Sequence, residues 1–75
     1  MKVTVKLIGP LINKLGFSEK EIDVPAATTV EGLMALIDVD KGRPKIVTRN
    51  GRAVAPGEEI EEGDRIVISP IYSGG

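Results

Sequence analysis

Residues 28–37 read TTVEGLMALI, and this stretch decides the fold. Its apolar residues recur at helical spacing, so it predicts a single amphipathic helix of about two and a half turns. Thr28 stands three residues before Glu31, which is the spacing of a capping box, and this predicts that the helix begins there. The apolar stripe needs a sheet to cover it, and its members are Val30, Leu33, Met34 and Ile37.

Two strands are expected before the helix. Residues 2–8, KVTVKLI, alternate strictly between polar and apolar side chains, as in a half-buried strand. Gly9-Pro10 breaks this pattern, and residues 11–16 are expected to form a short connection. Residues 17–24, FSEKEIDV, then form a second, more polar strand that ends before Pro25. The two strands should pair as a hairpin.

The remaining strands are expected after a charged loop at residues 38–45. Asn50-Gly51 predicts a hairpin, because a type I′ turn needs a positive φ at both central positions. Ile60 is expected to be an isolated apolar anchor between the hairpin and the last strand. The three strands predicted in this half are residues 46–49, 52–55 and 65–71.

A helix that follows one hairpin and precedes the other strands packs across one face of a mixed sheet. In this order, and within 75 residues, the arrangement predicts an α+β fold of the β-grasp, ubiquitin-like type. Residues 1–75 should form one domain with a flexible Gly-Gly tail. Two terminal glycines could also be an ordinary frayed chain end, so they indicate a function only together with the sequence that precedes them.

Composition excludes several classes of function. The sequence has no cysteine and no histidine, which removes disulfides, thiol nucleophiles, imidazole acid–base catalysis and the usual zinc sites. We therefore expect no metal and no cofactor on this chain. A net charge of −1 and only two aromatic residues argue against nucleic-acid binding. The sequence contains no apolar run long enough to cross a membrane and no export signal, so we expect a cytoplasmic protein.

Four segments together resemble the MoaD/ThiS family of ubiquitin-like sulfur carriers, most closely the small subunit of molybdopterin synthase. They are VTVKLIGPL, TTVEGLMALI, VTRNGRAV and EEIEEGDRIVISPIYSGG, and the last carries the strongest part of the resemblance. Ile8-Gly9-Pro10 and residues 70–73 differ from the sequences usual in molybdopterin carriers. The sulfur carriers of thiazole synthesis in the thiamine pathway therefore stay as an alternative.

The resemblance implies a carrier and not an enzyme. In such a family an E1-like adenylating enzyme, using ATP and Mg, converts the carboxylate of the last glycine to an acyl-adenylate and then to a thiocarboxylate. Gly75 would be the reacting residue and Gly74 the spacer. The sulfur would pass to the large subunit of molybdopterin synthase, or to thiazole synthase. Two more functions stay open, namely a protein modifier joined to lysines through Gly75 and an interaction module whose glycine tail has no role.

The last strand predicts a docking surface beside the tail. From Ile66 onward no residue is charged, which avoids burying an unpaired charge when a partner binds. If Ile66 and Ile68 face the helix, Val67 and Ser69 face away from it. Tyr72 is either the main anchor of the partner or a residue that closes the core. The residues predicted to contact partners are Val67, Pro70, Ile71, Tyr72 and Ser73.

Charge is uneven along the second half of the chain. Residues 41–52 carry five basic side chains and no acid, whereas residues 58–64 carry five acids and no base. Such runs usually form solvated loops. The functional interpretation is that they steer two different partners by their charge.

Overall fold

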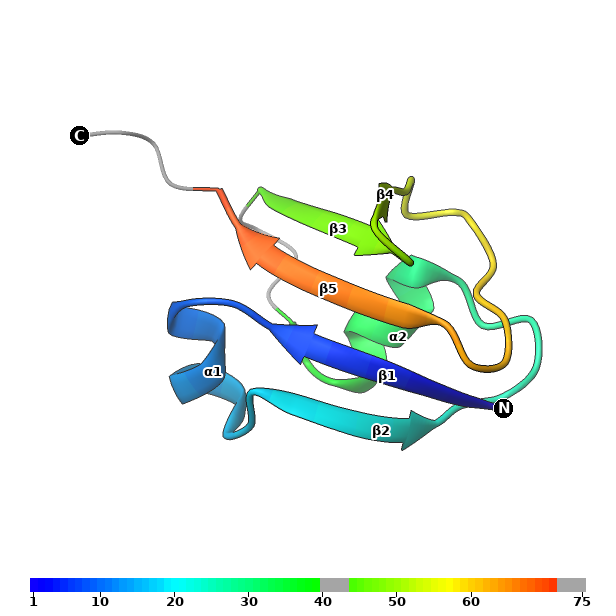
Figure 1. The fold of residues 1–75 in the computed structure, drawn as a ribbon, viewed down its shortest axis with the longest axis horizontal. Coiled ribbons are helices and arrows are strands. Elements are labelled where there is room, and N and C mark those ends of the chain that lie inside the picture. The colour runs from blue at the N-terminus through cyan, green and yellow to red at the C-terminus, as the bar shows by residue number, and fades with distance from the viewer. Residues whose placement is uncertain (40–43, 72–75) are drawn as a thin grey trace.

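The computed structural model of the protein describes residues 1–39 and 44–71 (Figure 1). Within these residues a strand, a short helix and a second strand precede the main helix, and three strands follow it. The bounds are β1 (Lys2–Leu7), α1 (Pro10–Leu15), β2 (Glu19–Asp23), α2 (Val30–Leu36), β3 (Lys45–Arg49), β4 (Arg52–Ala53) and β5 (Arg65–Pro70).

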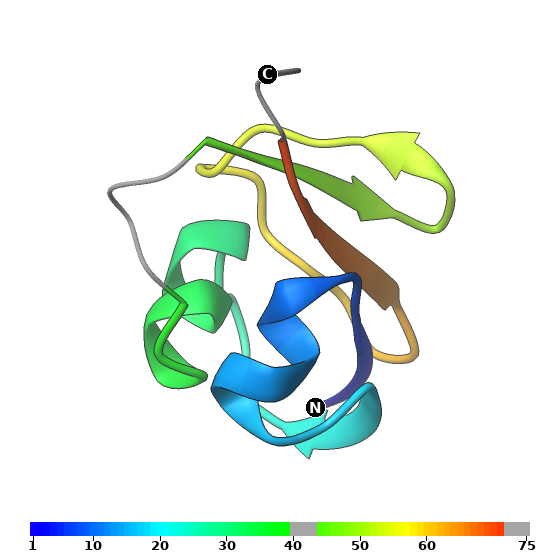
Figure 2. The ribbon, with the colours of Figure 1, turned by 90° about the vertical axis from the view of Figure 1, so that its left-hand side faces the viewer.

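The strands form one mixed sheet in the order β2-β1-β5-β3-β4. The last strand, β5, lies at its centre, parallel to β1 and antiparallel to β3. The outer strands β2 and β4 are antiparallel to their neighbours. The main helix α2 packs against one face of this sheet (Figures 1 and 2). This confirms the predicted α+β, β-grasp arrangement.

The core lies between α2 and the sheet. Successive strand residues point to opposite faces, so alternate residues of β1 and β5, all apolar, reach the helix side. The buried residues of α2 are Val30 and Leu33, as its spacing predicted, and Ile60 is buried as the expected anchor. The buried apolar residues are Val3, Val5, Leu7, Leu11, Val24, Val30, Leu33, Val39, Val47, Ile60, Ile66 and Ile68.

The segment predicted as a short connection is a helix, α1. Pro10 occupies its first turn, where the missing N–H costs no hydrogen bond. Gly16 ends it in the left-handed conformation, with its N–H donating to the carbonyl of Ile12 at 2.9 Å. Leu11 is buried and ties α1 to the core. The prediction was wrong because a helix of six residues shows too little periodicity to be recognised.

The main helix begins one residue later than predicted. Its N-cap is Thr29, whose hydroxyl oxygen accepts a hydrogen bond from the Gly32 N–H at 3.0 Å. The hydroxyl of Thr28 instead donates to the carbonyl of Pro25 at 2.6 Å. The Thr28–Glu31 capping box was therefore wrong. Two adjacent threonines offer the same chemistry, and the turn that starts at Pro25 selects between them.

The Asn50-Gly51 hairpin is confirmed, with φ of 52° at Asn50 and 85° at Gly51. Its second arm is shorter than predicted, because β4 ends at Ala53 and not at Ala55. The N–H of Ala55 donates to the Glu58 carboxylate at 2.7 Å, and its carbonyl accepts from the Glu58 N–H at 3.1 Å. The N–H and the carbonyl of Ala55 are thus hydrogen-bonded within a turn and are not available for strand pairing.

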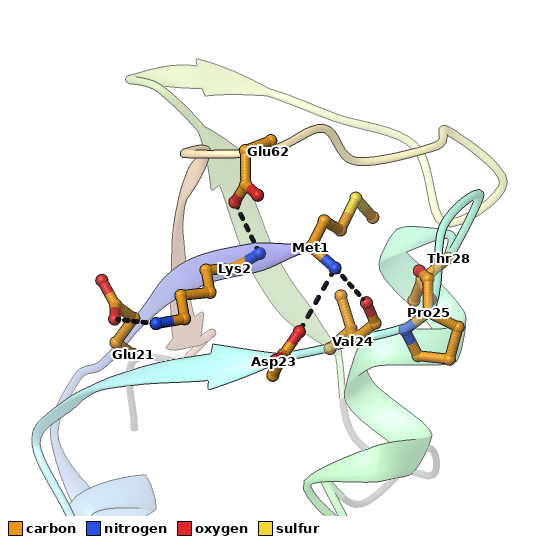
Figure 3. A network of polar contacts seen from close by, with 8 residues as sticks. All are labelled: Met1, Lys2, Glu21, Asp23, Val24, Pro25, Thr28 and Glu62. Atoms are coloured by element: carbon orange, nitrogen blue, oxygen red, sulfur yellow. Dashed lines mark hydrogen bonds and ion pairs between the residues drawn. The ribbon is translucent and has the colours of Figure 1, made fainter.

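Polar contacts hold the start of β1 at the end of the sheet where β5 also begins (Figure 3). The amino group of Met1 donates to the Asp23 carboxylate at 3.2 Å and to the carbonyl of Val24 at 2.7 Å. The Lys2 N–H donates to the Glu62 carboxylate at 2.6 Å. These contacts join β1 to the end of β2 and to the turn that leads into β5.

Candidate functional site

The sheet face opposite α2 is called the open face below. Along β5, Ile66 and Ile68 are fully buried beneath the helix. Val67 and Ser69 alternate with them on the open face and are only partly covered. The alternation predicted for the last strand is confirmed, and it places Val67 on the surface that the sequence indicated.

Charged side chains cover the half of the open face over β2 and β1. Lys2 lies 3.9 Å from Glu21, and Glu19 lies 3.9 Å from Lys6. Arg65, at the start of β5, reaches across β1 to Glu19 at 3.0 Å. These groups are largely exposed, so each pair contributes little to stability. Their effect on the surface is greater, because opposite charges neutralise one another across this half.

Beyond Arg65, no charged side chain lies on the other half of the open face within the described residues of β5, β3 and β4. Ile46 pairs with Ser69, and Thr48 pairs with both Val67 and Ala53, so these side chains share one surface. Ile46 is 51% exposed although it is a large apolar residue. The uncharged patch is defined here as Ile46, Thr48, Ala53, Val67, Ser69 and Ile71.

Ile46 was not predicted as part of the site. Its neighbour Val47 is buried, and neighbouring strand residues face opposite ways, so Ile46 lies on the open face. The sequence KIVTR does not say which of the two apolar residues faces the helix, so only the pairing with β5 decides it.

The patch continues to the end of β5. Ile71 directly follows Pro70 and is 48% exposed. Its N–H donates to the carbonyl of Pro44 at 3.2 Å, which extends the pairing of β5 with the β3 side by one residue. Val67, Pro70 and Ile71, predicted to contact partners, therefore lie along one strand and its end.

Four predicted site residues lie outside the described residues. They are Tyr72, Ser73, Gly74 and Gly75. Their roles stay predictions, and the choice between Tyr72 as an anchor and Tyr72 as a core residue stays open.

A buried carboxylate stands at the opposite end of β5. Asp64 accepts hydrogen bonds from Arg49 Nε at 2.6 Å, Asn50 Nδ2 at 2.9 Å and the Glu61 N–H at 2.7 Å. Burial acts to raise the pKa of this carboxyl group, but those hydrogen bonds and the charge of Arg49 outweigh it and hold the pKa below its ordinary value. Asn50 also accepts from the Arg65 N–H at 2.9 Å. These three residues, Arg49, Asn50 and Asp64, are called the base cluster because they lie at the base, or start, of β5. The base cluster thus fastens the β3–β4 turn to the start of β5.

The base cluster also joins the two charge runs. Arg49 from the basic run pairs with Asp64 and lies 3.7 Å from Glu61, both from the acidic run. Glu58 and Glu62 accept backbone N–H groups instead. At these residues the charged side chains stabilise the fold through hydrogen bonds and ion pairs, and part of their charge is neutralised. Lys41 and Arg43 lie outside the described residues.

In residues 1–39 and 44–71, no group of three or more acidic side chains is placed to hold a metal ion. No helix in the same part of the chain is long and apolar enough to span a membrane.

The ThiS family model matches residues 5–75, which is nearly the whole chain. The chain belongs to the ThiS family. This agrees with the predicted MoaD/ThiS-type sulfur-carrier relationship, and the fold is that of a small ubiquitin-like protein. No curated protein matches the sequence.

Solved structures similar to this ThiS-family chain come from archaea and bacteria. SAMP1 from Haloferax volcanii is 30% identical over 100% of both chains, with a TM-score of 0.81. A putative molybdopterin converting factor subunit 1 from Pyrococcus furiosus is 26% identical over 93% of this chain and 97% of its own, with a TM-score of 0.82. A chain of the complex of molybdopterin-converting factor subunits 1 and 2 from Helicobacter pylori is 20% identical over 100% of both chains, with a TM-score of 0.66. This last similarity concerns the fold.

Proposed function

We propose that this ThiS-family protein is a sulfur carrier for molybdopterin synthesis, and that Gly75 carries the sulfur. The observation that carries the proposal is the position of β5. Ser69 near its end and Ile71 just after it belong to the uncharged patch, and Tyr72-Ser73-Gly74-Gly75 follow in the sequence. A partner that covers the patch would therefore have the glycine carboxylate close to its own reactive groups.

The proposed chemistry starts from an unreactive group. A carboxylate resists nucleophiles because it is negatively charged and has no good leaving group. An oxygen of the Gly75 carboxylate would attack the α-phosphorus of ATP and release pyrophosphate. Hydrosulfide from the sulfur source would then attack the acyl-adenylate carbonyl and form a C–S bond. The bond from the carbonyl carbon to the AMP oxygen would break, AMP would leave with the electron pair, and loss of the sulfur-bound proton would give the thiocarboxylate. In this proposal ATP and Mg would be bound by the activating partner. The sulfur source would also come from outside this chain, which has no thiol.

The uncharged patch suits docking to a protein surface. Burying Ile46 or Ile71 against a partner removes apolar area from water at about 25 cal/mol per Å². Docking there breaks no ion pair among the described residues of the open face, because its charged side chains pair among themselves over β1 and β2. The two partners that the proposal requires are an E1-like adenylating enzyme and the large subunit of molybdopterin synthase, with thiazole synthase as the counterpart in the thiamine pathway.

Protein modification is a second candidate function. A similar structure, 24% identical, is described as the small archaeal modifier protein 1 of Haloferax volcanii, and SAMP1 of the same organism is the 30% identical match. Both functions begin with adenylation of the last glycine. They differ in the attacking group, which is sulfur in a carrier and a lysine amine in a modifier.

Intact mass spectrometry tests the proposal. The protein is incubated with ATP, Mg, the activating enzyme and a sulfur source. A carrier gains the mass difference between sulfur and oxygen, located on Gly75 by fragmentation. A chain lacking Gly75 and a chain with one added alanine serve as controls. Both should melt like the parent and gain no sulfur, because one residue changes the reach by about 3.5 Å.

The outcomes separate the candidates. Sulfur on either control chain would contradict a reaction specific to Gly75. Isopeptide products without sulfur on the free protein would favour the modifier. An unchanged mass in every sample would leave only the interaction module.

A further inference from the structure

The central strand β5 is held by its two neighbours over different lengths. On the β1 side the pairing ends at Ile68, which lies opposite Leu7 and accepts a hydrogen bond from the Ile8 N–H at 3.1 Å. On the β3 side the pairing runs on to Pro70, opposite Lys45, and then to the hydrogen bond between the Ile71 N–H and the Pro44 carbonyl. In the part of the chain that the structure describes, the end of β5 thus has backbone pairing on one side, with β3.

Proline at position 70 fits this one-sided support. Even-numbered residues of this segment direct their backbone groups toward β1, as the Asp64 and Ile68 carbonyls show. A residue at position 70 would therefore direct its N–H toward the β1 side, beyond Leu7, where β1 has ended. Proline has no N–H to place there, and its ring restricts both its own φ and the conformation of Ser69. The chain consequently reaches Ile71 along a stiff path.

We propose that the hydrogen bond between the Ile71 N–H and the Pro44 carbonyl fixes the point at which the tail leaves the sheet. This point, called the origin below, sets how far the reacting glycine can reach. This inference rests on the proposed function. Four residues follow Ile71 in the sequence, and they span at most about 14 Å when fully extended. The reactive pocket of a partner must then open within about 14 Å of Ile71. The backbone groups of Pro44 and Ile71 are positioning groups.

The rate of sulfur transfer should depend steeply on the length of the tail, because one residue is long compared with the displacement that the reaction tolerates. One residue changes the reach by up to about 3.5 Å, whereas misplacing reacting atoms by about 1 Å costs about 100-fold in rate. Losing the hydrogen bond would move the origin back to Ser69, the previous residue whose backbone groups face β3, and would lengthen the tail by two residues. Removing one tail residue should then be partly compensated, because the longer tail still reaches the pocket.

This compensation is tested with a double-variant cycle, read as the rate of sulfur incorporation at Gly75. Ile71→Pro removes the N–H, and Ile71→Ala keeps the N–H while also removing the isoleucine side chain. Deletion of Ser73 shortens the tail by one residue. In the parent and in Ile71→Ala, the deletion should lower the rate by about 100-fold or more. In Ile71→Pro the same deletion should cost about tenfold or less. Equal losses in the three backgrounds would overturn the inference.

Hydrogen exchange followed by NMR provides a readout that does not depend on sulfur transfer. The Ile71 amide should exchange at least about tenfold more slowly than an unprotected amide, in the parent and in a Pro44→Ala variant, which keeps the accepting carbonyl. An Ile71 amide that exchanges freely would overturn the inference even if sulfur transfer occurs. A parent that gains no sulfur would overturn the proposed function and the positioning role together. A parent that gains sulfur but shows equal losses in the cycle would overturn the positioning role alone.

Discussion

The two ends of β5 are built differently. At its start, the base cluster buries a carboxylate among three hydrogen-bond donors and fastens a turn to the strand. At its finish, one backbone hydrogen bond holds Ile71, and two large apolar side chains, Ile46 and Ile71, are exposed. The difference predicts a division between the two ends: substitutions at the start of β5 affect folding, and substitutions at its end affect partner binding. Variants at the two ends test this.

The largest effect is expected at the base. Asp64→Ala should lower the free energy of unfolding by about 2 to 4 kcal/mol, because it leaves Arg49 and Asn50 without their shared acceptor. Denaturant unfolding measures this loss. Binding to the partner, corrected for the folded fraction, should not change. A loss of affinity without a loss of stability would contradict the division.

The same carboxylate predicts a pH dependence. Its pKa is lowered in the folded protein, so its stabilising effect is complete above the unfolded pKa of about 4 and is lost as the pH falls through the folded value. Asp64→Asn cannot titrate there. The stability advantage of the parent over Asp64→Asn should therefore be constant at neutral pH and shrink below about pH 4. An advantage that does not change with acid would show that the pKa of Asp64 is the same in the folded and unfolded states and is not lowered by folding.

At the finish of β5, Tyr72→Ala should weaken partner binding by about 2 kcal/mol while the melting temperature stays the same. Titration calorimetry and thermal unfolding measure the two quantities. Unchanged affinity together with a lower melting temperature would assign Tyr72 to the core. This prediction decides between the two roles that the sequence leaves open for Tyr72.

A smaller effect is expected at Ile46, in the middle of the uncharged patch. Ile46→Ala should weaken partner binding by about 1 to 1.5 kcal/mol and change stability by less than about 0.5 kcal/mol. The matched control is Leu36→Ala on α2, because Leu36 is 60% exposed but belongs to a different surface. Equal losses of affinity in both variants would show that the patch has no special role.

The smallest effect is expected in the charged half of the open face. Glu19→Gln removes the partner of both Lys6 and Arg65, yet should change stability by less than about 0.5 kcal/mol, because these groups are exposed. Partner binding should also change little at about 0.15 M salt, where exposed charges are screened. A large loss of affinity would extend the docking surface across β1 and β2.

Much of the fold could be predicted from local patterns. The alternation in residues 2–8 and in β5 placed the correct side chains in the core, and Asn50-Gly51 predicted the turn correctly. These signals are strong because each depends on a few adjacent residues and one backbone geometry. The α1 helix was missed because six residues show too little periodicity. The cap at Thr29 and the early end of β4 were missed because the turns at Pro25 and Ala55 select among nearly equal local choices.

The candidate site divides in the same way. The partner-binding roles of Val67, Pro70 and Ile71 stay predictions. The positions of Val67 on the open face and of Pro70 and Ile71 at the end of the strand could be predicted, because the alternation in β5 is clear. Ile46 and the base cluster could not, since each depends on which strands become neighbours. Arg49 and Asp64 are 15 residues apart, and no local pattern links them.

The sequence alone determined the order of the strands and the main helix, the position of the hairpin turn and the absence of charge in the last strand from Ile66 onward. Each of these follows from short-range periodicity, from the φ preferences of glycine and asparagine, or from the absence of charge. Tertiary structure alone decided that β5 lies between β1 and β3, and with it the uncharged patch, the buried Asp64 and the hydrogen bond at Ile71. The physical reason is that strand pairing brings together residues far apart in the chain, and the packing of the whole core selects one register among several that local preferences allow.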